Sequence, residues 1–328
     1  ARFRIRARFR IDPELLSPPI MPQTFEHIVI GAGISGLGSA HRAIRKGVST
    51  LVLEASDRVG GCMNSRTFAG CGDFWVEGGS HTCFNSYGHL LDTLDDLGML
   101  ERLVPKAKLR YSLWRGGARR SIFSALHPLE LALSVPRVLA GKKEGRSVAD
   151  FYSAGLGRRN YEDVFGPAFR AVICQNADDF PADLLFRRKP RRKDVVRSFT
   201  FPGGLSDIPR AIAQQQGLEL RTGESVASAH RRSDGGFRVL LDDGTELGCD
   251  YLTLAVPPDV AAKLLQSDRQ DLSTLAERIN IAEVESLVLC IRGKDLEHLP
   301  PLAGLIAVDD AFYSAVSRDY LTDDTYRG

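Results

Sequence analysis

The sequence predicts an α/β protein with a strand–turn–helix–strand unit near its start, and three observations support this. Residues 27–30 are an apolar run that fits a buried parallel strand. Gly31, Gly33 and Gly36 follow in the spacing G-x-G-x-x-G. A second apolar run, residues 49–53, ends on Glu54, which lies 23 positions after Gly31. The motif has meaning because it sits between a strand and a helix.

Each position of this unit has a physical role in binding a dinucleotide. Gly31 permits a tight turn, Gly33 lets the backbone approach a pyrophosphate, and Gly36 lets helix and strand pack closely. We expect the phosphates at the N-terminus of a helix that begins near Ser35, because free N–H groups and the helix dipole favour anions there. Glu54 is placed to accept a hydrogen bond from a ribose hydroxyl.

The segment after Glu54 carries a second glycine pair that a plain NAD fold does not need. Residues 55–61 read Ala-Ser-Asp-Arg-Val-Gly-Gly. This motif resembles the long FAD fingerprint of the amine oxidase, protoporphyrinogen oxidase and phytoene desaturase superfamily. The resemblance implies FAD as the cofactor, with residues 58–61 around its diphosphate and ribityl chain.

The resemblance extends over about residues 26–320. Residues 74–81 resemble the family's strand and turn beside the isoalloxazine ring, and 87–98 the helix after it. Residues 201–205 resemble the F-x-G-G-[ML] turn, 225–226 the strand at the adenine end, and 252–257 the L-A-x-P strand end. Residues 147–151, 155–159 and 164–177 place the nearest likeness in the protoporphyrinogen oxidase branch. The residues expected at FAD are Gly31, Gly33, Ile34, Ser35, Gly36, Glu54, Ala55, Ser56, Arg58, Gly60, Gly61, Arg66, Gly78, Gly79, Ser80, His81, Val226 and Ala255.

The chain departs from the family pattern at three places. Cys62 stands where the family has an arginine, although Arg66 follows nearby. Residues 283–291, near Ser286, contain no lysine, whereas amine oxidases usually carry one there that holds a water near flavin N5. Nothing after Thr253 resembles the family's late G-[DE] motif. We therefore expect that a C-terminal segment is lacking, by disorder or truncation, and that a chain without it binds FAD weakly.

The function that the resemblance implies is an FAD-dependent oxidase or desaturase that transfers hydride from its substrate to flavin N5. The substrate is expected to be large, apolar and conjugated, nearest to protoporphyrinogen or coproporphyrinogen. Arg66 and His81 are the candidate catalytic residues, and a structural turn histidine is the alternative for His81. The alternative enzymes are a carotenoid-type desaturase and an amine oxidase. A lipid-binding chaperone of the GDP-dissociation-inhibitor type is the non-enzyme alternative, but it has no need of the phosphate turn and Glu54.

The predicted architecture is a Rossmann-like FAD-binding domain of the glutathione-reductase type, interrupted by a mixed α+β substrate domain and a helical insertion. Residues 22–82 form the first part of the FAD domain, 83–200 the substrate and helical insertion, and 201–265 the second part of the FAD domain. Turn signals at residues 234–236 and 242–244 predict two hairpins. Residues 266–328 return to the substrate domain, with a strand expected at 284–291. Residues 1–20 are interpreted as upstream or vector-derived sequence.

Composition narrows the class of partner. The net charge of +2 indicates no particular partner, and the six cysteines lack a C-x-x-C pair or zinc-site spacing. This predicts reduced thiols in a cytoplasmic protein without a metal site. Residues 122–140 are apolar and residues 187–193 contain six basic side chains in seven. Residues 122–140 are a candidate for the mouth of an apolar substrate channel or for contact with a membrane face, with a helical core segment as the alternative. Residues 187–193 are a candidate for binding anionic lipid head groups at the inner membrane face or an acidic substrate such as a porphyrin propionate, with a solvated loop as the alternative. The basic run lacks interleaved aromatic residues, so nucleic acid is not expected.

Overall fold

The computed structural model describes residues 23–71, 74–106, 110–187, 189–265, 270–279, 281–296, 304–316 and 326–327. Residues 1–20, interpreted above as upstream sequence, lie outside these ranges. Contacts divide the chain into two compact units. Unit 1 comprises Ala1–Val59 and Gln215–Arg278, and unit 2 comprises Gly60–Gln214 and Ile279–Gly328. The chain passes from unit 1 to unit 2 after Val59 and returns after Gln214, whereas the sequence analysis expected boundaries at 82/83 and 200/201. The difference arises because strands β3 and β4 and helix α8 make their contacts within unit 2.

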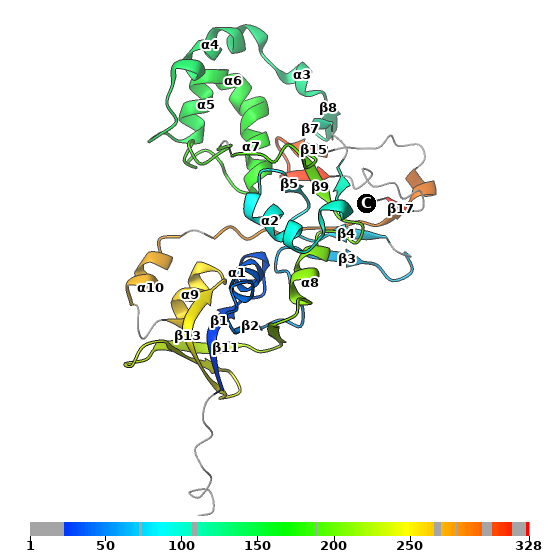
Figure 1. Ribbon diagram of the computed structural model, residues 1–328. Helices are drawn as coiled ribbons and strands as arrows, with labels where there is room; N and C mark the ends of the chain where they lie inside the picture. The colour runs from blue at the N-terminus through cyan, green and yellow to red at the C-terminus, as the bar shows by residue number, and fades with distance from the viewer. Residues whose placement is uncertain are drawn as a thin grey trace, which may run out of the picture. The chain divides into compact units, whose positions relative to one another are not determined.

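Unit 1 is a six-stranded mixed sheet with helices, which is the α/β fold that the sequence predicts. Its strand order is β10-β2-β1-β13-β12-β11. The first four strands are parallel and the last two pairings are antiparallel. The strands are β1 (Gln23–Ile30), β2 (Thr50–Glu54), β10 (Leu218–Thr222), β11 (Val226–Arg231), β12 (Phe237–Leu241) and β13 (Glu246–Leu254). The helices are α1 (Ile34–Ile44), α9 (Pro258–Leu264) and α10 (Gln270–Ala276) (Figure 1).

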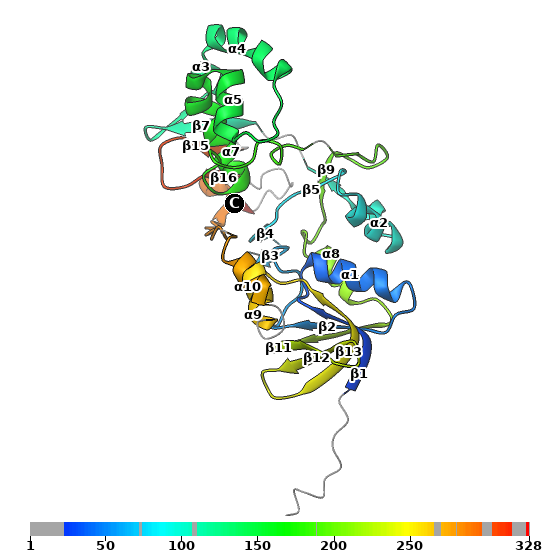
Figure 2. The same ribbon diagram turned by 90° about the vertical axis from the view of Figure 1, so that its left-hand side faces the viewer.

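The sheet alternates its apolar residues between two covered faces, as strands buried on both sides require. Ile28 and Ile30 of β1 pack with Leu51 and Leu53 of β2 in one hydrophobic cluster. Val29 points the other way, to the side on which α1 lies against β1 and β2 (Figure 2). The two hairpins predicted at residues 234–236 and 242–244 are confirmed by the antiparallel β11–β12 and β12–β13 pairings.

Unit 2 contains small sheets and several helices. Its sheets are β3-β4, β5-β9-β6, β16-β15-β7-β8 and β14-β17. The strands are β3 (Ser65–Thr67), β4 (Trp75–Glu77), β5 (Cys83–Phe84), β6 (Val104–Pro105), β7 (Tyr111–Arg115), β8 (Ala118–Arg120), β9 (Ser198–Thr200), β14 (Ile291–Arg292), β15 (Gly304–Ala307), β16 (Ser314–Val316) and β17 (Tyr326–Arg327). The helices are α2 (Gly88–Asp96), α3 (Ile122–Ala125), α4 (Pro128–Ala140), α5 (Val148–Leu156), α6 (Arg158–Asn160), α7 (Gly166–Ile173) and α8 (Asp207–Ala213).

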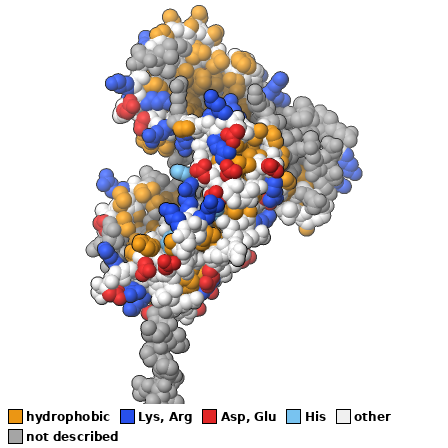
Figure 3. Space-filling model, viewed as in Figure 1, with side chains coloured by type: hydrophobic (Ala, Val, Ile, Leu, Met, Phe, Trp, Pro, Cys, Tyr) orange, Lys and Arg blue, Asp and Glu red, His pale blue; other side chains and the backbone are white. Residues whose placement is uncertain are grey.

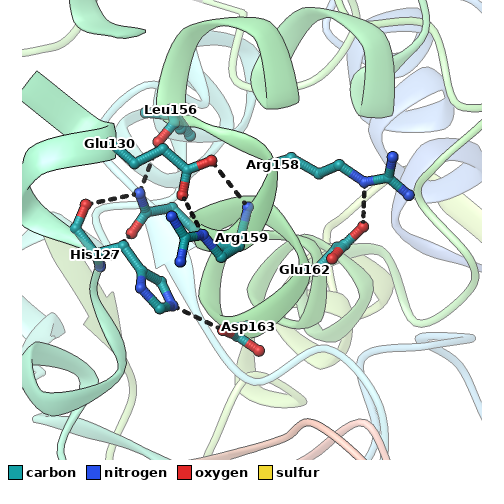
Figure 4. A network of polar contacts seen from close by, with 8 residues as sticks. His127, Glu130, Leu156, Arg158, Arg159, Glu162 and Asp163 are labelled. Atoms are coloured by element: carbon teal, nitrogen blue, oxygen red, sulfur yellow. Dashed lines mark hydrogen bonds and ion pairs between the residues drawn. The ribbon is translucent and has the colours of Figure 1, made fainter. Parts of the chain in front are cut away.

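A buried amide joins the helices of the insertion. Asn160 is completely buried, and its Oδ1 accepts from the His127 backbone N–H at 2.8 Å. Its Nδ2 donates to the carbonyls of His127 and Leu156 at 3.1 and 2.9 Å. Around it, His127 Nε2 lies 3.1 Å from Asp163 Oδ2, and Glu130 pairs with Arg159 (Figure 4). The amide thus connects the start of α4 to α5 and α6.

The prediction of a strand at residues 284–291 is wrong over most of that range. Residues 281–290 have no regular secondary structure, and only Ile291 lies in a strand, β14. Leu287 exposes 88% of its surface and Leu289 exposes 59%. An apolar run becomes a strand only where a neighbour pairs with its backbone, and no described strand pairs with residues 284–290.

Candidate functional site

The glycine turn of unit 1 is closed by contacts that leave no room for a larger residue at its first glycine. Gly31 has φ +100°, and its N–H donates to the Leu53 carbonyl at 2.8 Å. A Cβ at Gly31 would lie 2.6 Å from the Ala255 carbonyl oxygen. Ala255 itself donates its N–H to the Ile30 carbonyl at 2.8 Å. The turn is therefore held between the ends of β1, β2 and β13.

The N-terminus of α1 is shaped to receive an anion. A Cβ at Gly36 would clash with the Gly31 carbonyl oxygen and lie 3.1 Å from Val29 Cγ1, so glycine permits the close helix–strand packing. Gly33 is the N-cap, gives no side-chain cap and has nothing within 4 Å of the position of a Cβ. The first turn, which includes Ile34 and Ser35, has no acidic residue. These features fit a diphosphate bound to the first N–H groups of an 11-residue helix.

Glu54 is fixed at both carboxylate oxygens. Its Oε2 accepts from the Ala32 N–H at 2.7 Å, and its Oε1 accepts from the Ser56 N–H at 3.0 Å and the Ser56 hydroxyl at 2.7 Å. Burial raises the pKa of this carboxyl, but the hydrogen bonds from Ser56 and Ala32 and the charge of Arg58 outweigh burial and leave the pKa lowered. An ionised carboxylate held in this way fits a ribose diol as its donor.

The remaining residues of unit 1 that were expected at FAD either follow Glu54 in the sequence or are connected to its segment by backbone hydrogen bonds. Ala55, Ser56 and Arg58 follow Glu54 and are exposed, and the Ser56 hydroxyl oxygen lies 2.9 Å from the Arg58 carbonyl oxygen. The Gly223 N–H donates to the Ser56 carbonyl and the Glu224 N–H to the Glu54 carbonyl. These bonds bring the start of β11, at Val226, to the same edge of unit 1.

In unit 2, the structure brings the second glycine pair and the 78–81 turn together. Gly60 and Gly61 lead into a loop whose Cys62 carbonyl accepts from the Ser80 N–H at 2.8 Å. The Asn64 carbonyl accepts from the Gly78 N–H at 2.7 Å, and Gly79 lies between these two bonds. Arg66, in β3, is exposed, with its guanidinium beside the Asn64 side-chain amide. The predicted flavin-edge segments therefore form one local structure.

Glu77 holds this structure to the 201–205 turn, and the sequence did not single it out. Its Oε1 accepts from the Leu205 N–H at 2.8 Å and its Oε2 accepts from the Ser65 hydroxyl at 2.8 Å. Trp75 adds a bond from Nε1 to the Pro202 carbonyl at 2.7 Å. A carboxylate directly before Gly78-Gly79 was visible in the sequence, but nothing local indicated its partner 128 residues away.

Lys106 is a second residue that sequence reasoning missed. Its Nζ donates to the His81 carbonyl and to the Thr82 hydroxyl, both at 2.6 Å. Burial lowers the pKa of Lys106 to about 8, against the opposing charges of Glu77 and Cys83. Desolvation by the surrounding protein, together with the charge of Lys106, lowers the pKa of the His81 imidazole, although His81 keeps an exposed edge. At neutral pH a neutral imidazole and a charged ammonium group thus adjoin the expected flavin-edge turn.

The fold and these contacts define a class: an α/β protein with the glycine turn and strand-end carboxylate of a dinucleotide-binding βαβ unit. The chain belongs to the flavin containing amine oxidoreductase family, whose model matches residues 34–324. FAD is the cofactor of this family, and the contacts of Gly33 and Glu54 described above fit it. Membership also favours an enzyme over the lipid-binding chaperone considered above.

Known proteins show how far the likeness extends. The chain is 48% identical over 284 residues to "Protein anon-37Cs" of Drosophila lebanonensis. This match covers 72% of this chain and 50% of that protein. The chain is 46% identical over 282 residues to Polyamine oxidase 1 of Zea mays, covering 74% and 53%. A crystal structure of a putative protoporphyrinogen oxidase from Exiguobacterium sp. 255-15 superposes with a TM-score of 0.66 at 17% identity, covering 93% of this chain and 75% of that chain. The chain spans about half the length of these two curated relatives.

Proposed function

We propose that this protein is an FAD-dependent oxidoreductase that oxidises a large, apolar, conjugated substrate bearing carboxylates, of the protoporphyrinogen or coproporphyrinogen type. In this proposal Gly33, Glu54 and their neighbours hold the FAD diphosphate and ribose, and the 60–66 and 78–81 segments adjoin the flavin ring. Bound FAD supplies the two-electron chemistry. The residues of the chain bind and orient the substrate and exclude water.

The observation that supports an anionic substrate is the position of the basic segment 187–193. Asn85, which follows β5, donates from Nδ2 to the carbonyls of Arg192 and Val195 at 2.8 and 3.1 Å. The Arg192 N–H donates to the Asn85 carbonyl at 2.9 Å. Lys189 Nζ lies 5.9 Å from the centre of the Tyr87 ring. The basic segment is therefore attached to the chain that directly follows His81 and Thr82.

Charge favours carboxylates over polycations at this surface. Arg192 is engaged by Asp194 and Asp95, but Arg187, Lys189, Arg191 and Lys193 are exposed. Such a group of cations attracts the carboxylates of a porphyrinogen and repels a polyamine. A neutral carotenoid would gain nothing from it.

Amine oxidation is the second candidate, and one specific observation favours it: the 46% identity to Polyamine oxidase 1 of Zea mays. Residues 283–291, however, contain no lysine. The segment also lacks the strand expected there, so it presents no regular element that could hold such a side chain.

A charge-reversal experiment tests the proposal. The double variant Arg191→Glu/Lys193→Glu is compared with Arg158→Glu, which reverses an exposed charge on α6. With coproporphyrinogen, we expect the double variant to raise KM about tenfold, with a smaller effect in high salt. Arg158→Glu is expected to leave KM unchanged. An unchanged KM for coproporphyrinogen in the double variant would contradict the anionic-substrate proposal. A double variant that changes only the KM for a polyamine, by lowering it, would contradict the proposal as well.

Peripheral membrane contact is part of the proposal, with a cytoplasmic location at the inner membrane face. No helix among the described residues has the length and apolar content needed to cross a bilayer. Residues 122–140 form α3 and α4, on which Phe123, Leu129 and Leu133 expose 85, 81 and 76% of their surface. Figure 3 shows orange hydrophobic side chains at the top of the view, the region in which α3 and α4 are labelled in Figure 1. Such side chains on short helices suit an interfacial position.

Vesicle sedimentation tests the membrane contact. We expect the protein to sediment with vesicles that contain anionic phospholipid, and Phe123→Ser/Leu129→Ser to reduce the bound fraction several-fold. Tyr251→Ser, which changes an exposed aromatic residue of unit 1, is the matched control. Equal sedimentation of all three proteins would exclude α3 and α4 as the contact.

A further inference from the structure

Two cysteine thiols from distant parts of the chain lie against each other in unit 2. The Sγ atoms of Cys71 and Cys290 are 3.4 Å apart, although 219 positions separate the residues. Both residues are half-buried, so small solutes reach them. The six cysteines are all reduced in the structure.

Local structure fixes each member of this pair. Cys71 lies in the connection between β3 and β4, where its N–H donates to the Phe68 carbonyl and its carbonyl accepts from the Phe74 N–H, both at 3.1 Å. Cys290 directly precedes β14, which pairs with β17. Hydrogen bonds of its own backbone therefore place Cys71, and the paired strand that follows it places Cys290.

We propose that Cys71 and Cys290 form a dithiol site that a peroxide converts to a disulfide. A disulfide needs a sulfur–sulfur distance of about 2.05 Å, so the atoms must approach by only about 1.4 Å. Small rotations about the two Cα–Cβ bonds can supply this movement. The resulting bond would tie the irregular segment 281–290 to the β3–β4 connection, next to the strand that carries Arg66.

The chemistry balances with hydrogen peroxide as the oxidant. One thiolate attacks a peroxide oxygen, the O–O bond breaks, and a sulfenic acid and one water form after proton transfer. The second thiol then attacks the sulfenic sulfur, the S–S bond forms, and a second water leaves. In total two thiols lose two electrons and two protons, and one peroxide is reduced to two waters.

The other cysteines are poorer partners. Burial raises the pKa of Cys83 to about 12 and that of Cys249 to about 11, which keeps both as unreactive thiols. The Cys174 thiol lies 3.8 Å from the Ala171 carbonyl, within its own helix end. Cys62 is exposed, which makes it the reference for a thiol that reacts without a designated partner.

Peroxide treatment followed by thiol mapping tests the proposal. The reduced full chain is treated with hydrogen peroxide, alkylated and digested without reductant for mass spectrometry. We expect a linked Cys71–Cys290 peptide and the loss of two alkylatable thiols. On a non-reducing gel, trypsin cleavage after the exposed Arg278 should leave fragment 279–328 attached to the rest of the chain. Because peroxide is added, the result does not depend on the proposed substrate.

Two variants separate this pair from general oxidation. Cys62→Ser should retain the linked peptide, and Cys71→Ser should lose it and leave Cys290 open to alkylation. The proposal is overturned if Cys71 and Cys290 are both alkylated at a peroxide dose that oxidises Cys62. It is also overturned if either cysteine is found only as a sulfinic or sulfonic acid, or linked to Cys62.

Discussion

In the proposed FAD site, the Glu54 carboxylate is the group that binds the ribose. Both of its oxygens already accept hydrogen bonds, from Ala32 and from Ser56. A glutamine can supply only one acceptor oxygen and would turn an amide toward an N–H donor. The hydrogen bonds within the protein therefore require an acid at position 54 even before a ribose is bound.

We expect Glu54→Gln to weaken FAD binding roughly 10- to 100-fold, since a hydrogen bond to a charged group contributes about 1.5–3 kcal/mol. The quenching of FAD fluorescence on titration with protein measures this. Glu26→Gln is the matched control, because the Glu26 carboxylate accepts from the Ser49 N–H at 2.7 Å at the opposite end of the sheet. Unchanged affinity in Glu54→Gln, or equal loss in both variants, would remove Glu54 from the site.

Lys106 gives the clearest pH dependence at the residue scale. Its pKa is lowered to about 8 in the folded protein, from 10.5, first by burial. Below pH 8 the lysine is charged in both the folded and unfolded states, and the cost of burying the charge is fully present. Between about pH 8 and 10.5 the unfolded chain still binds the proton and the folded chain releases it. The free energy of unfolding contributed by this group therefore rises with pH over that interval.

Comparison with Lys106→Met isolates this effect. Over pH 8 to 10.5, we expect wild-type stability to rise relative to the variant by about 2 kcal/mol, an order-of-magnitude value for a partly buried group. Urea unfolding at a series of pH values measures the difference. A difference that stays flat, or that changes only below pH 8, would contradict the lowered pKa.

At the scale of elements, the β3–β4 hairpin and the 201–205 turn are joined by Glu77. Glu77→Ala removes the acceptors for the Leu205 N–H and the Ser65 hydroxyl. We expect a loss of about 2–3 kcal/mol in the free energy of unfolding of unit 2. The fluorescence of buried Trp75, which donates to the Pro202 carbonyl of the same turn, reports the transition. Glu162→Ala, at an exposed ion pair, should have little effect, and equal effects would contradict the account.

The helical insertion depends in the same way on Asn160. Asn160→Ala leaves the His127 N–H and carbonyl and the Leu156 carbonyl without this partner, at a cost of about 3 kcal/mol. Hydrogen exchange of residues 122–165 should become faster. Arg158→Ala, which breaks an exposed pair with Glu162, should leave exchange unchanged. Protection that survives in Asn160→Ala would show that the apolar contacts alone hold these helices.

Sequence predicts local elements better than contacts between distant ones. The 31–36 turn and Glu54 were predictable because one motif fixes their spacing within a single βαβ unit. The bonds of Lys106 to His81 and Thr82, and of Glu77 to Leu205, were not, since no local pattern specifies a partner 25 or 128 residues away. The prediction of a strand at 284–291 failed for a related reason. The apolar pattern is present, but no described strand pairs with residues 284–290.

At the scale of the whole molecule, the sheet of unit 1 confirms the predicted α/β fold, and the family match confirms the predicted likeness to flavin-containing amine oxidoreductases. We propose that substrate choice depends instead on the surface of unit 2, where the basic segment 187–193 attaches to the chain after His81. The glycine motifs and the fold do not separate a porphyrinogen from an amine, because both classes of enzyme share them.

Anaerobic reduction of the FAD-loaded protein tests the central claim most directly. The flavin absorbance at about 450 nm is followed while coproporphyrinogen or, separately, a polyamine is added. We expect coproporphyrinogen to bleach the band within the time of mixing and the polyamine to leave it unchanged. Bleaching by the polyamine alone would contradict the proposed substrate and assign the protein to amine oxidation.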